Sequence, residues 1–183
     1  MAFLAIKECE RELDQIERSI DEELPKAIAR AAESKARELL GSLKFITDLE
    51  RIGDLVLWVA LRLEIINAVP KETQQKMKAM ADVLASMLED VHEGFVRRNV
   101  GLAESVIAKD KQMNRLCRDL FQQYLKRGAA SPKQHSVEIL LMTQALERAG
   151  DHATNLAEEL HNLILGHTVR HAPKGTNTVM TNE

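Results

Sequence analysis

Apolar residues recur every three or four positions along most of the chain, the spacing that places them on one face of an α-helix. Leu4, Leu13 and Ile20 begin this pattern near the N-terminus. The periodic segments are residues 3–24, 27–68, 71–99, 102–126 and 131–165. The sequence therefore predicts an all-α protein, followed after Gly166 by a disordered tail over 167–183.

Proline and glycine mark the boundaries that we expect between these helices. Pro25 ends the first helix or begins the second, and Pro70 closes the second segment. Gly41 divides that segment if it forms two helices instead of one long helix. Gly101 marks the break before the fourth segment, and Ser131-Pro132 supplies an N-cap and a first helical residue for the last one.

One six-residue phrase, Leu-Glu-Arg-x-Gly-Asp, occurs twice in the chain, over residues 49–54 and 146–151. Its two glycines, Gly53 and Gly150, are 97 positions apart. Upstream, residues 10–14 align with residues 110–114 at a spacing of 100. We interpret these matches as an internal duplication. The second half begins with the helix 71–99, whereas the first half has almost no counterpart of that helix.

Carboxylates and carboxamides follow one ridge of each repeated helix. Glu147, Asp151 and Asn155 are four residues apart, so their side chains lie on the same face. Several converging oxygen ligands suit a hard or borderline cation, and without one such carboxylates repel each other or take up protons. The candidate metal ligands are Glu147, Asp151, Asn155, Asp110, Asn114, Glu50, Asp54, Glu10 and Asp14.

A structural role for the same carboxylates stays open beside the metal hypothesis. Glu50 and Glu147 are each followed by an arginine, Arg51 and Arg148, that can pair with a carboxylate on the same or the next helix. Acidic residues four apart are also common on solvated helices. His152, beside the second ridge, can complete or tune a metal shell.

The composition excludes several classes of protein. The formal charge of −3 and the lack of a basic stretch argue against nucleic-acid binding. Cys9 and Cys117 form no CxxC motif and read as reduced thiols, with a long-range disulfide as the alternative. No apolar run approaches the ~20 residues of a membrane span, and the short apolar start is not a signal peptide. We expect a cytosolic protein.

The two glycine motifs resemble the twice-repeated signature of the PhoU family, and the copy at 146–158 is nearly a full match. The resemblance covers about residues 3–165. It implies two similar three-helix bundles that act with the phosphate ABC transporter ATPase and its sensor histidine kinase, at the inner face of the membrane. Such proteins repress the phosphate-starvation response. The resemblance also implies iron or zinc clusters held by the acidic motifs.

On this basis we expect a truncated first repeat over residues 1–69 and a second repeat over 70–166. The first copy departs from the pattern, because Trp58 replaces Asn155 and Leu55 replaces His152. A two-helix unit leaves an apolar stripe exposed, so we expect a partner chain or neighbouring bundle to cover it, as in a homodimer.

Two other interpretations remain. A similar domain follows the membrane part of some sodium–phosphate cotransporters, so the chain can be a regulatory domain of that kind. A di-iron bundle enzyme is suggested by two Glu-x-x-His pairs, Glu89 with His92 and Glu158 with His161. We found no nucleophile elbow, P-loop or dinucleotide motif, and therefore expect no catalytic activity.

Overall fold

The computed structural model describes residues 2–127 and 135–165, which form six α-helices. They are α1 (Ala2–Ile28), α2 (Glu33–Ala60), α3 (Leu63–Asn67), α4 (Lys71–Arg97), α5 (Val100–Arg127) and α6 (Ser136–Leu165). The prediction of an all-α protein is confirmed. The predicted helix start at Ser131-Pro132 and the predicted disordered tail lie outside the described residues.

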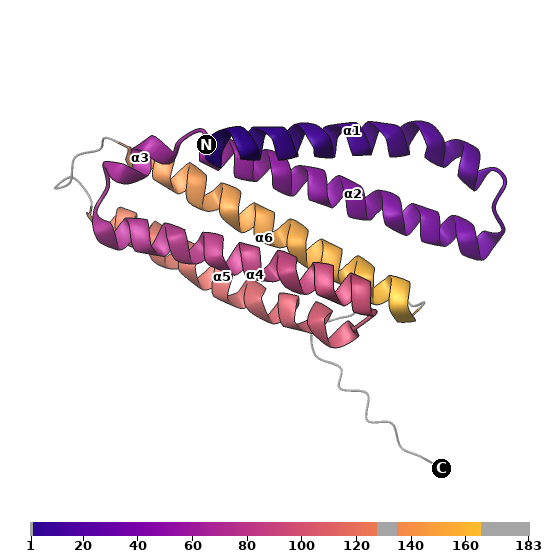
Figure 1. The fold of residues 1–183 in the computed structure, drawn as a ribbon. Coiled ribbons are helices and arrows are strands. Elements are labelled where there is room, and N and C mark those ends of the chain that lie inside the picture. The colour runs from indigo at the N-terminus through magenta and orange to yellow at the C-terminus, as the bar shows by residue number, and fades with distance from the viewer. Residues whose placement is uncertain (1, 128–134, 166–183) are drawn as a thin grey trace, which may run out of the picture.

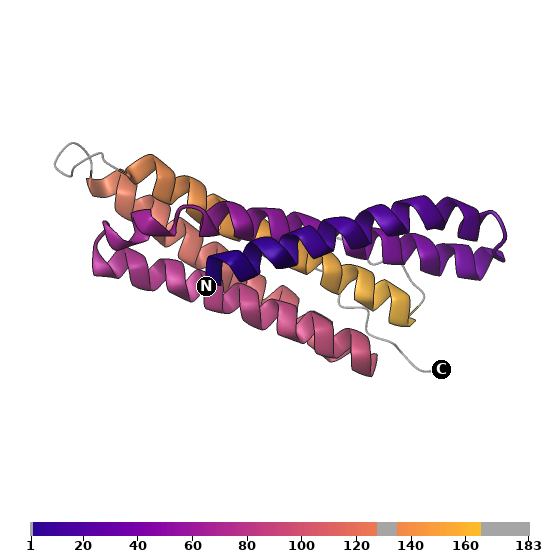
Figure 2. The same cartoon turned by 45° about the horizontal axis from the view of Figure 1, so that its top comes forward.

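The long helices form a three-helix bundle with a helical hairpin on its side. Helices α4, α5 and α6 pack against one another, α2 packs along α6, and α1 packs along α2 (Figure 1). The turn between α1 and α2 projects past the end of α6 in both views (Figures 1 and 2). Helix α6 therefore joins the hairpin to the bundle.

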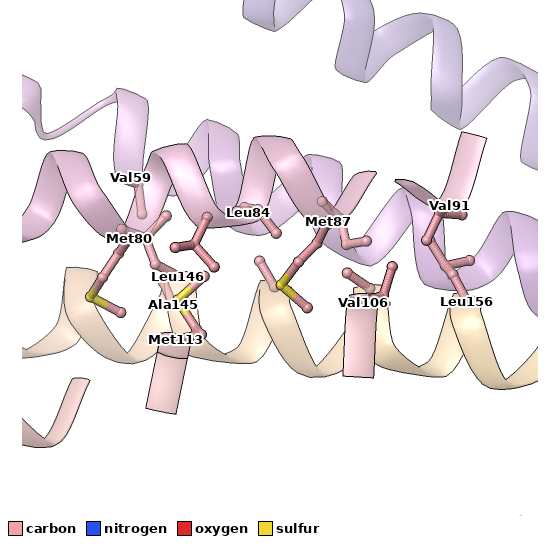
Figure 3. Packing of buried hydrophobic residues seen from close by; sticks show 14 of the residues in the cluster. Val59, Met80, Leu84, Met87, Val91, Val106, Met113, Ala145, Leu146 and Leu156 are labelled. Atoms are coloured by element: carbon pink, nitrogen blue, oxygen red, sulfur yellow. The ribbon is translucent and has the colours of Figure 1, made fainter. Parts of the chain in front are cut away.

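The core runs along the inside of the α4–α6 bundle and continues to the face of α2 (Figure 3). Methionines fill much of it, because their unbranched side chains fit irregular gaps between helices. Met80, Met87 and Met113 are fully buried, and Val59 of α2 joins the same cluster. The methionine and valine stripe of α4 thus has a packing role.

The structure corrects several predicted boundaries. Helix α1 does not end at Pro25 but continues to Ile28, because a proline near the end of a helix removes only one N–H from the ladder. Gly41 does not divide α2; it is a buried residue in the interior of that helix. The second segment divides instead at Leu61 and Arg62, before the short α3.

The break after α4 lies at Arg98 and not at Gly101, which is inside α5. Arg98 caps α4 in the left-handed region, with φ 50°. Glycine usually occupies this position, because the Cβ of any other residue is crowded by the backbone in the left-handed conformation. A sequence pattern that relies on glycine therefore misses this cap.

A partly buried ion pair links α4 to α5. Lys109 Nζ donates to Asp90 Oδ2 at 2.6 Å and to Ser86 Oγ at 2.7 Å. Burial by itself raises the pKa of Asp90, but hydrogen bonds from Lys109 and Ser105 and the lysine charge outweigh burial, and the pKa is lowered. The ionised form of Asp90 is thus the form that stabilises the fold.

We expect Asp90→Asn to lower the free energy of unfolding by about 1–3 kcal/mol at pH 7. A lowered pKa in the folded state gives stability above the ordinary aspartate pKa, and this stability is lost as the pH falls through the folded pKa. The difference between wild type and variant should therefore shrink below about pH 4.

Urea unfolding from pH 7 to pH 3 measures this difference in the free energy of unfolding. Asp82→Asn, which breaks an exposed pair with Lys78, is the control and should change little. A pH-independent Asp90 effect would contradict the assignment.

Candidate acidic site

The carboxylates of the second motif meet those of α5 along the seam between α5 and α6. Glu147 is half-buried and Asp151 is exposed on α6, and Asp110 faces them from α5. Asn114 Nδ2 donates to Asp110 Oδ2 at 2.8 Å, which orients the Asp110 carboxylate. Four predicted ligands from the second repeat therefore lie along this seam. We call Asp110, Asn114, Glu147 and Asp151 the acidic site.

The electrostatics of the acidic site favour a bound proton or cation. Burial raises the pKa of Glu147, and the negative charges of Asp151 and Asp110 raise it further. Burial also raises the pKa of Asp151, although His152 and Arg148 act in the opposite direction. Like charges held close together in a partly desolvated seam disfavour full ionisation. A positive ion near these oxygens would relieve that repulsion.

Asn155 does not join the acidic site. Its Nδ2 donates to Asp48 Oδ1 of α2 at 3.3 Å, and Nδ1 of His152 lies 2.8 Å from the same oxygen. An ionised carboxylate only accepts, so the histidine nitrogen is the donor in this contact. Asp48 thus accepts hydrogen bonds from two side chains of α6, and these bonds connect α2 to α6. These two motif residues hold the hairpin on the bundle.

The first copy of the motif has a different set of neighbours. Burial raises the pKa of Glu50, and the negative charges of Asp54 and Glu17 raise it further, whereas Arg51 lowers it. Glu50 Oε2 is buried and accepts no hydrogen bond within the described chain, and Arg51 Nε lies 3.6 Å away. Glu17 is therefore the α1 carboxylate that acts on Glu50.

The two predicted α1 ligands, Glu10 and Asp14, are both half-buried. Asp14 accepts from Arg18 Nη2 at 3.3 Å, one turn away on α1. Arg51 also lies 3.9 Å from Asp54 Oδ2. Arg51 therefore pairs with carboxylates of its own motif, which is the structural role that the sequence analysis left open beside metal binding.

In the part of the chain that the structure describes, no three His, Cys, Asp or Glu side chains converge closely enough to hold a metal ion. The oxygen donors nevertheless fit a cation by their chemistry, because carboxylates and a carboxamide lie along one seam and the pKa values of Glu147 and Asp151 are raised. Binding would require Glu147, Asp151 and Asp110 to close around the ion.

The two motif glycines serve one packing purpose in both copies. A Cβ at Gly150 would lie 3.1 Å from Cγ of Met113 on α5, and a Cβ at Gly53 would lie 3.0 Å from Cδ1 of Leu13 on α1. Leu13 and Met113 are the residues that the spacing of 100 aligns. Glycine thus lets the neighbouring helix approach closely at the same place in each copy, beside each acidic ridge.

Sequence reasoning missed three residues near these ridges: Asp48, Glu17 and Cys117. Asp48 precedes the first motif by one residue and has no counterpart in the duplication, since position 145 is alanine. Glu17 is one helical turn beyond Asp14, so a search along the whole α1 ridge would have included it. Cys117 lies one turn beyond Asn114 and faces the acidic site.

Cys117 should react slowly with alkylating reagents. Burial raises its pKa to about 11, and the negative charges of Glu147 and Asp151 contribute. At pH 8 about one molecule in a thousand would carry the thiolate, which is the nucleophile. Iodoacetamide labelling followed by mass spectrometry should modify the exposed Cys9 first, and the Cys117 rate should still rise between pH 9 and 10. A Cys117 rate that levels off below pH 9 would contradict the raised pKa. Both cysteines are free thiols.

The di-iron interpretation fails on the placement of its first pair. Glu89 and His92 are both exposed on the outer face of α4. A di-iron bundle needs each Glu-x-x-His pair to project into the core.

Comparison with known proteins decides the family. The PhoU domain profile matches residues 2–62 and 77–160. The chain belongs to the PhoU family. It is 29% identical over 160 residues to a phosphate-specific transport system accessory protein PhoU homolog of Rhizobium meliloti, covering 84% of this chain and 68% of that protein. It is 30% identical over 172 residues to the homolog of Pseudomonas putida, covering 91% and 67%.

Solved PhoU structures have the same fold. The crystal structure of PhoU from Pseudomonas aeruginosa matches with a TM-score of 0.81 and 27% identity, over 90% of this chain and 82% of that one. The regulatory protein PhoU from Streptococcus pneumoniae matches in fold with a TM-score of 0.77. Membership makes this chain a PhoU-like accessory protein of phosphate transport and not an enzyme. Among the described residues, no helix is long and apolar enough to cross a membrane.

Proposed function

We propose that this chain represses the phosphate-starvation response when phosphate is plentiful, by docking to the phosphate ABC transporter ATPase and to its sensor histidine kinase. The observation that carries the proposal is the retention of both signature copies, with their glycines packed alike against α1 and α5. The relatives named above are phosphate-specific transport system accessory proteins, which supports a role beside a transporter. The chain would act in the cytoplasm, at the inner face of the membrane.

Docking can be tested with purified components. The chain should bind the ATPase subunit of the phosphate transporter in biolayer interferometry. Charge reversal at the exposed Asp54 and Asp151 should weaken this binding if the acidic ridges face the partner. Asp82→Lys, which reverses an exposed charge on α4, is the matched control. Equal binding by all variants would show that the acidic ridges lie outside the interface. If the wild-type chain does not bind, the ATPase subunit is not its partner.

We further propose that the acidic site holds an iron or zinc ion or cluster. Asp110, Glu147 and Asp151 would supply carboxylate oxygens and Asn114 a carboxamide oxygen. The bound metal would offset the repulsion that raises the pKa of Glu147. Self-association into a homo-oligomer stays a prediction from the sequence, and sedimentation equilibrium measures it.

Metal content provides the test. Protein incubated with Fe³⁺ or Zn²⁺ and then desalted should retain metal by elemental analysis. Glu147→Gln with Asp151→Asn should abolish retention at this site, and Asp82→Asn should not. If the double variant retains as much metal as wild type, the acidic site is not the metal site.

A further inference from the structure

A cavity of about 850 Å³ lies between α2, α4 and α6, at the end of the bundle where α4 and α6 stop (Figure 1). Its volume falls within the range of about 300–1,000 Å³ that is typical of small-molecule sites. It shares no residue with the acidic site, which lies on the seam between α5 and α6. We call it the end cavity, and the lining residues that matter below are Arg37, Lys44, Phe95, Arg98 and Glu159.

One carboxylate of the end cavity is buried and incompletely paired. The side chain of Glu159, on α6, is only 8% exposed. Its Oε2 accepts no hydrogen bond within the described chain, and Lys44 Nζ lies 3.7 Å away, which is too long for one. A buried acceptor without a donor is costly and requires an explanation. A ligand in the cavity that donates hydrogen bonds to Glu159 would supply one.

The neighbouring helix makes room for this carboxylate. A Cβ at Gly41 of α2 would lie 2.9 Å from Glu159 Oε1, closer than such atoms normally pack. Gly41 is in the interior of α2, where glycine weakens a helix. The position of the Glu159 carboxylate against α2 therefore depends on both helices, and it explains a glycine that marks no helix boundary.

Basic side chains line the same cavity. Arg37 and Lys44 belong to α2, and Arg98 caps α4. Arg98 has a φ of 50°, and residues held in this strained region occur preferentially at ligand sites. Three basic groups disfavour a simple cation as the occupant, because like charges repel. A simple anion would leave Glu159 without a donor. The occupant should therefore carry N–H donors at one end and negative charge at the other.

An aromatic ring provides a third kind of contact. Phe95 of α4 lies 5.5 Å from Phe45 of α2, measured between ring centroids, and is 54% exposed although it is a large apolar residue. Nucleic-acid bases stack on such rings irrespective of their sequence. A carboxylate for N–H groups, a ring for a flat heterocycle and arginines for phosphate together match the parts of a nucleotide.

We propose that the end cavity binds a guanine nucleotide. Guanine presents two neighbouring donors, N1–H and its 2-amino group, which match the two oxygens of the Glu159 carboxylate. The base rests against Phe95, and Arg37 and Arg98 pair with the phosphates through charge-assisted hydrogen bonds. Adenine presents an acceptor at N1, which a carboxylate repels. The proposal goes beyond the docking role proposed above, since that role assigns no small molecule to the chain.

Displacement of a fluorescent nucleotide tests the proposal with the whole chain. The probe is N-methylanthraniloyl-GDP, followed by fluorescence anisotropy, and the competitors are GDP, inosine diphosphate, ADP and pyrophosphate. We expect saturable binding that GDP reverses. Inosine diphosphate, which lacks the 2-amino group, should compete about ten-fold more weakly, as the loss of one hydrogen bond to a charged group predicts. ADP and pyrophosphate should compete more weakly still.

Two variants locate the binding. Glu159→Gln keeps the shape of the side chain but replaces one acceptor by a donor, so GDP should bind about ten-fold more weakly. Glu104→Gln, at an exposed carboxylate of α5 outside the cavity, is the matched control and should bind GDP as the wild type does.

Arg98→Gly separates binding from folding. Glycine suits the left-handed conformation, so this variant should resist urea at least as well as the wild type. Because it loses a phosphate contact, its affinity for GDP should nevertheless fall about ten-fold. A purely structural role for Arg98 would leave the affinity unchanged.

Three results would overturn the proposal. The first is no saturable binding that GDP reverses. The second is competition by ADP or pyrophosphate as strong as that by GDP, which would show that the chain does not read the base. The third is unchanged GDP affinity of both Glu159→Gln and Arg98→Gly. None of these results depends on the phosphate-starvation assay, so the proposal and the regulatory function can fail separately.

Discussion

Met113→Ala is expected to lower the free energy of unfolding by about 2–5 kcal/mol. Met113 is fully buried and lies against Gly150, where α5 packs on α6. Its truncation leaves a cavity in a core that α4 closes from the other side, so the surrounding helices cannot easily fill the space. Urea unfolding followed by circular dichroism measures the loss.

Leu13→Ala is the matched control within the same molecule. Leu13 takes the corresponding place against Gly53, but it is only half-buried. We expect a loss of about 1 kcal/mol, because less apolar surface is removed from water at this residue and no closed cavity forms. Equal losses at the two positions would contradict the view that the first copy has an open face.

Asp48→Ala is expected to lower the free energy of unfolding by about 1–3 kcal/mol and to loosen the hairpin. The variant leaves two half-buried donors, on His152 and Asn155, without their acceptor. Hydrogen exchange should rise in α2 and in the facing part of α6 and stay unchanged in α4. Both effects can be measured on the purified chain.

Asp54→Ala on the same helix provides the comparison. Asp54 is 47% exposed and its pairing with Arg51 at 3.9 Å is long, so its removal should change stability by less than about 0.5 kcal/mol. If Asp48→Ala is as mild as Asp54→Ala, the Asp48 contacts do not hold the hairpin on the bundle.

Helix type and most helix positions could be predicted from apolar spacing, because a long periodic stripe has few alternatives. Boundaries at Pro25 and Arg98 could not, since they depend on local backbone geometry that residue identity does not determine. Proline is tolerated near the end of α1, and Arg98 adopts a left-handed conformation that usually belongs to glycine.

The candidate site could be predicted in part. The duplication placed Glu147, Asp151, Asp110 and Asn114 near one another, because aligned motifs on adjacent helices share a register. It did not indicate that Asn155 bonds to Asp48 of α2. The contact between Asn155 and Asp48 depends on how α2 of the first copy packs against α6 of the second. A sequence pattern within one copy does not contain that information.

The measurement that tests the central claim most directly is a reporter assay in the organism that carries this gene. The gene is deleted, and alkaline phosphatase activity is followed in phosphate-replete medium. We predict that the reporter turns on, that the wild-type chain turns it off again, and that Asp54→Ala and Asp151→Ala restore repression less well. If the reporter stays off after deletion, although the wild-type gene is shown to be expressed, the chain has the PhoU fold but does not repress this response.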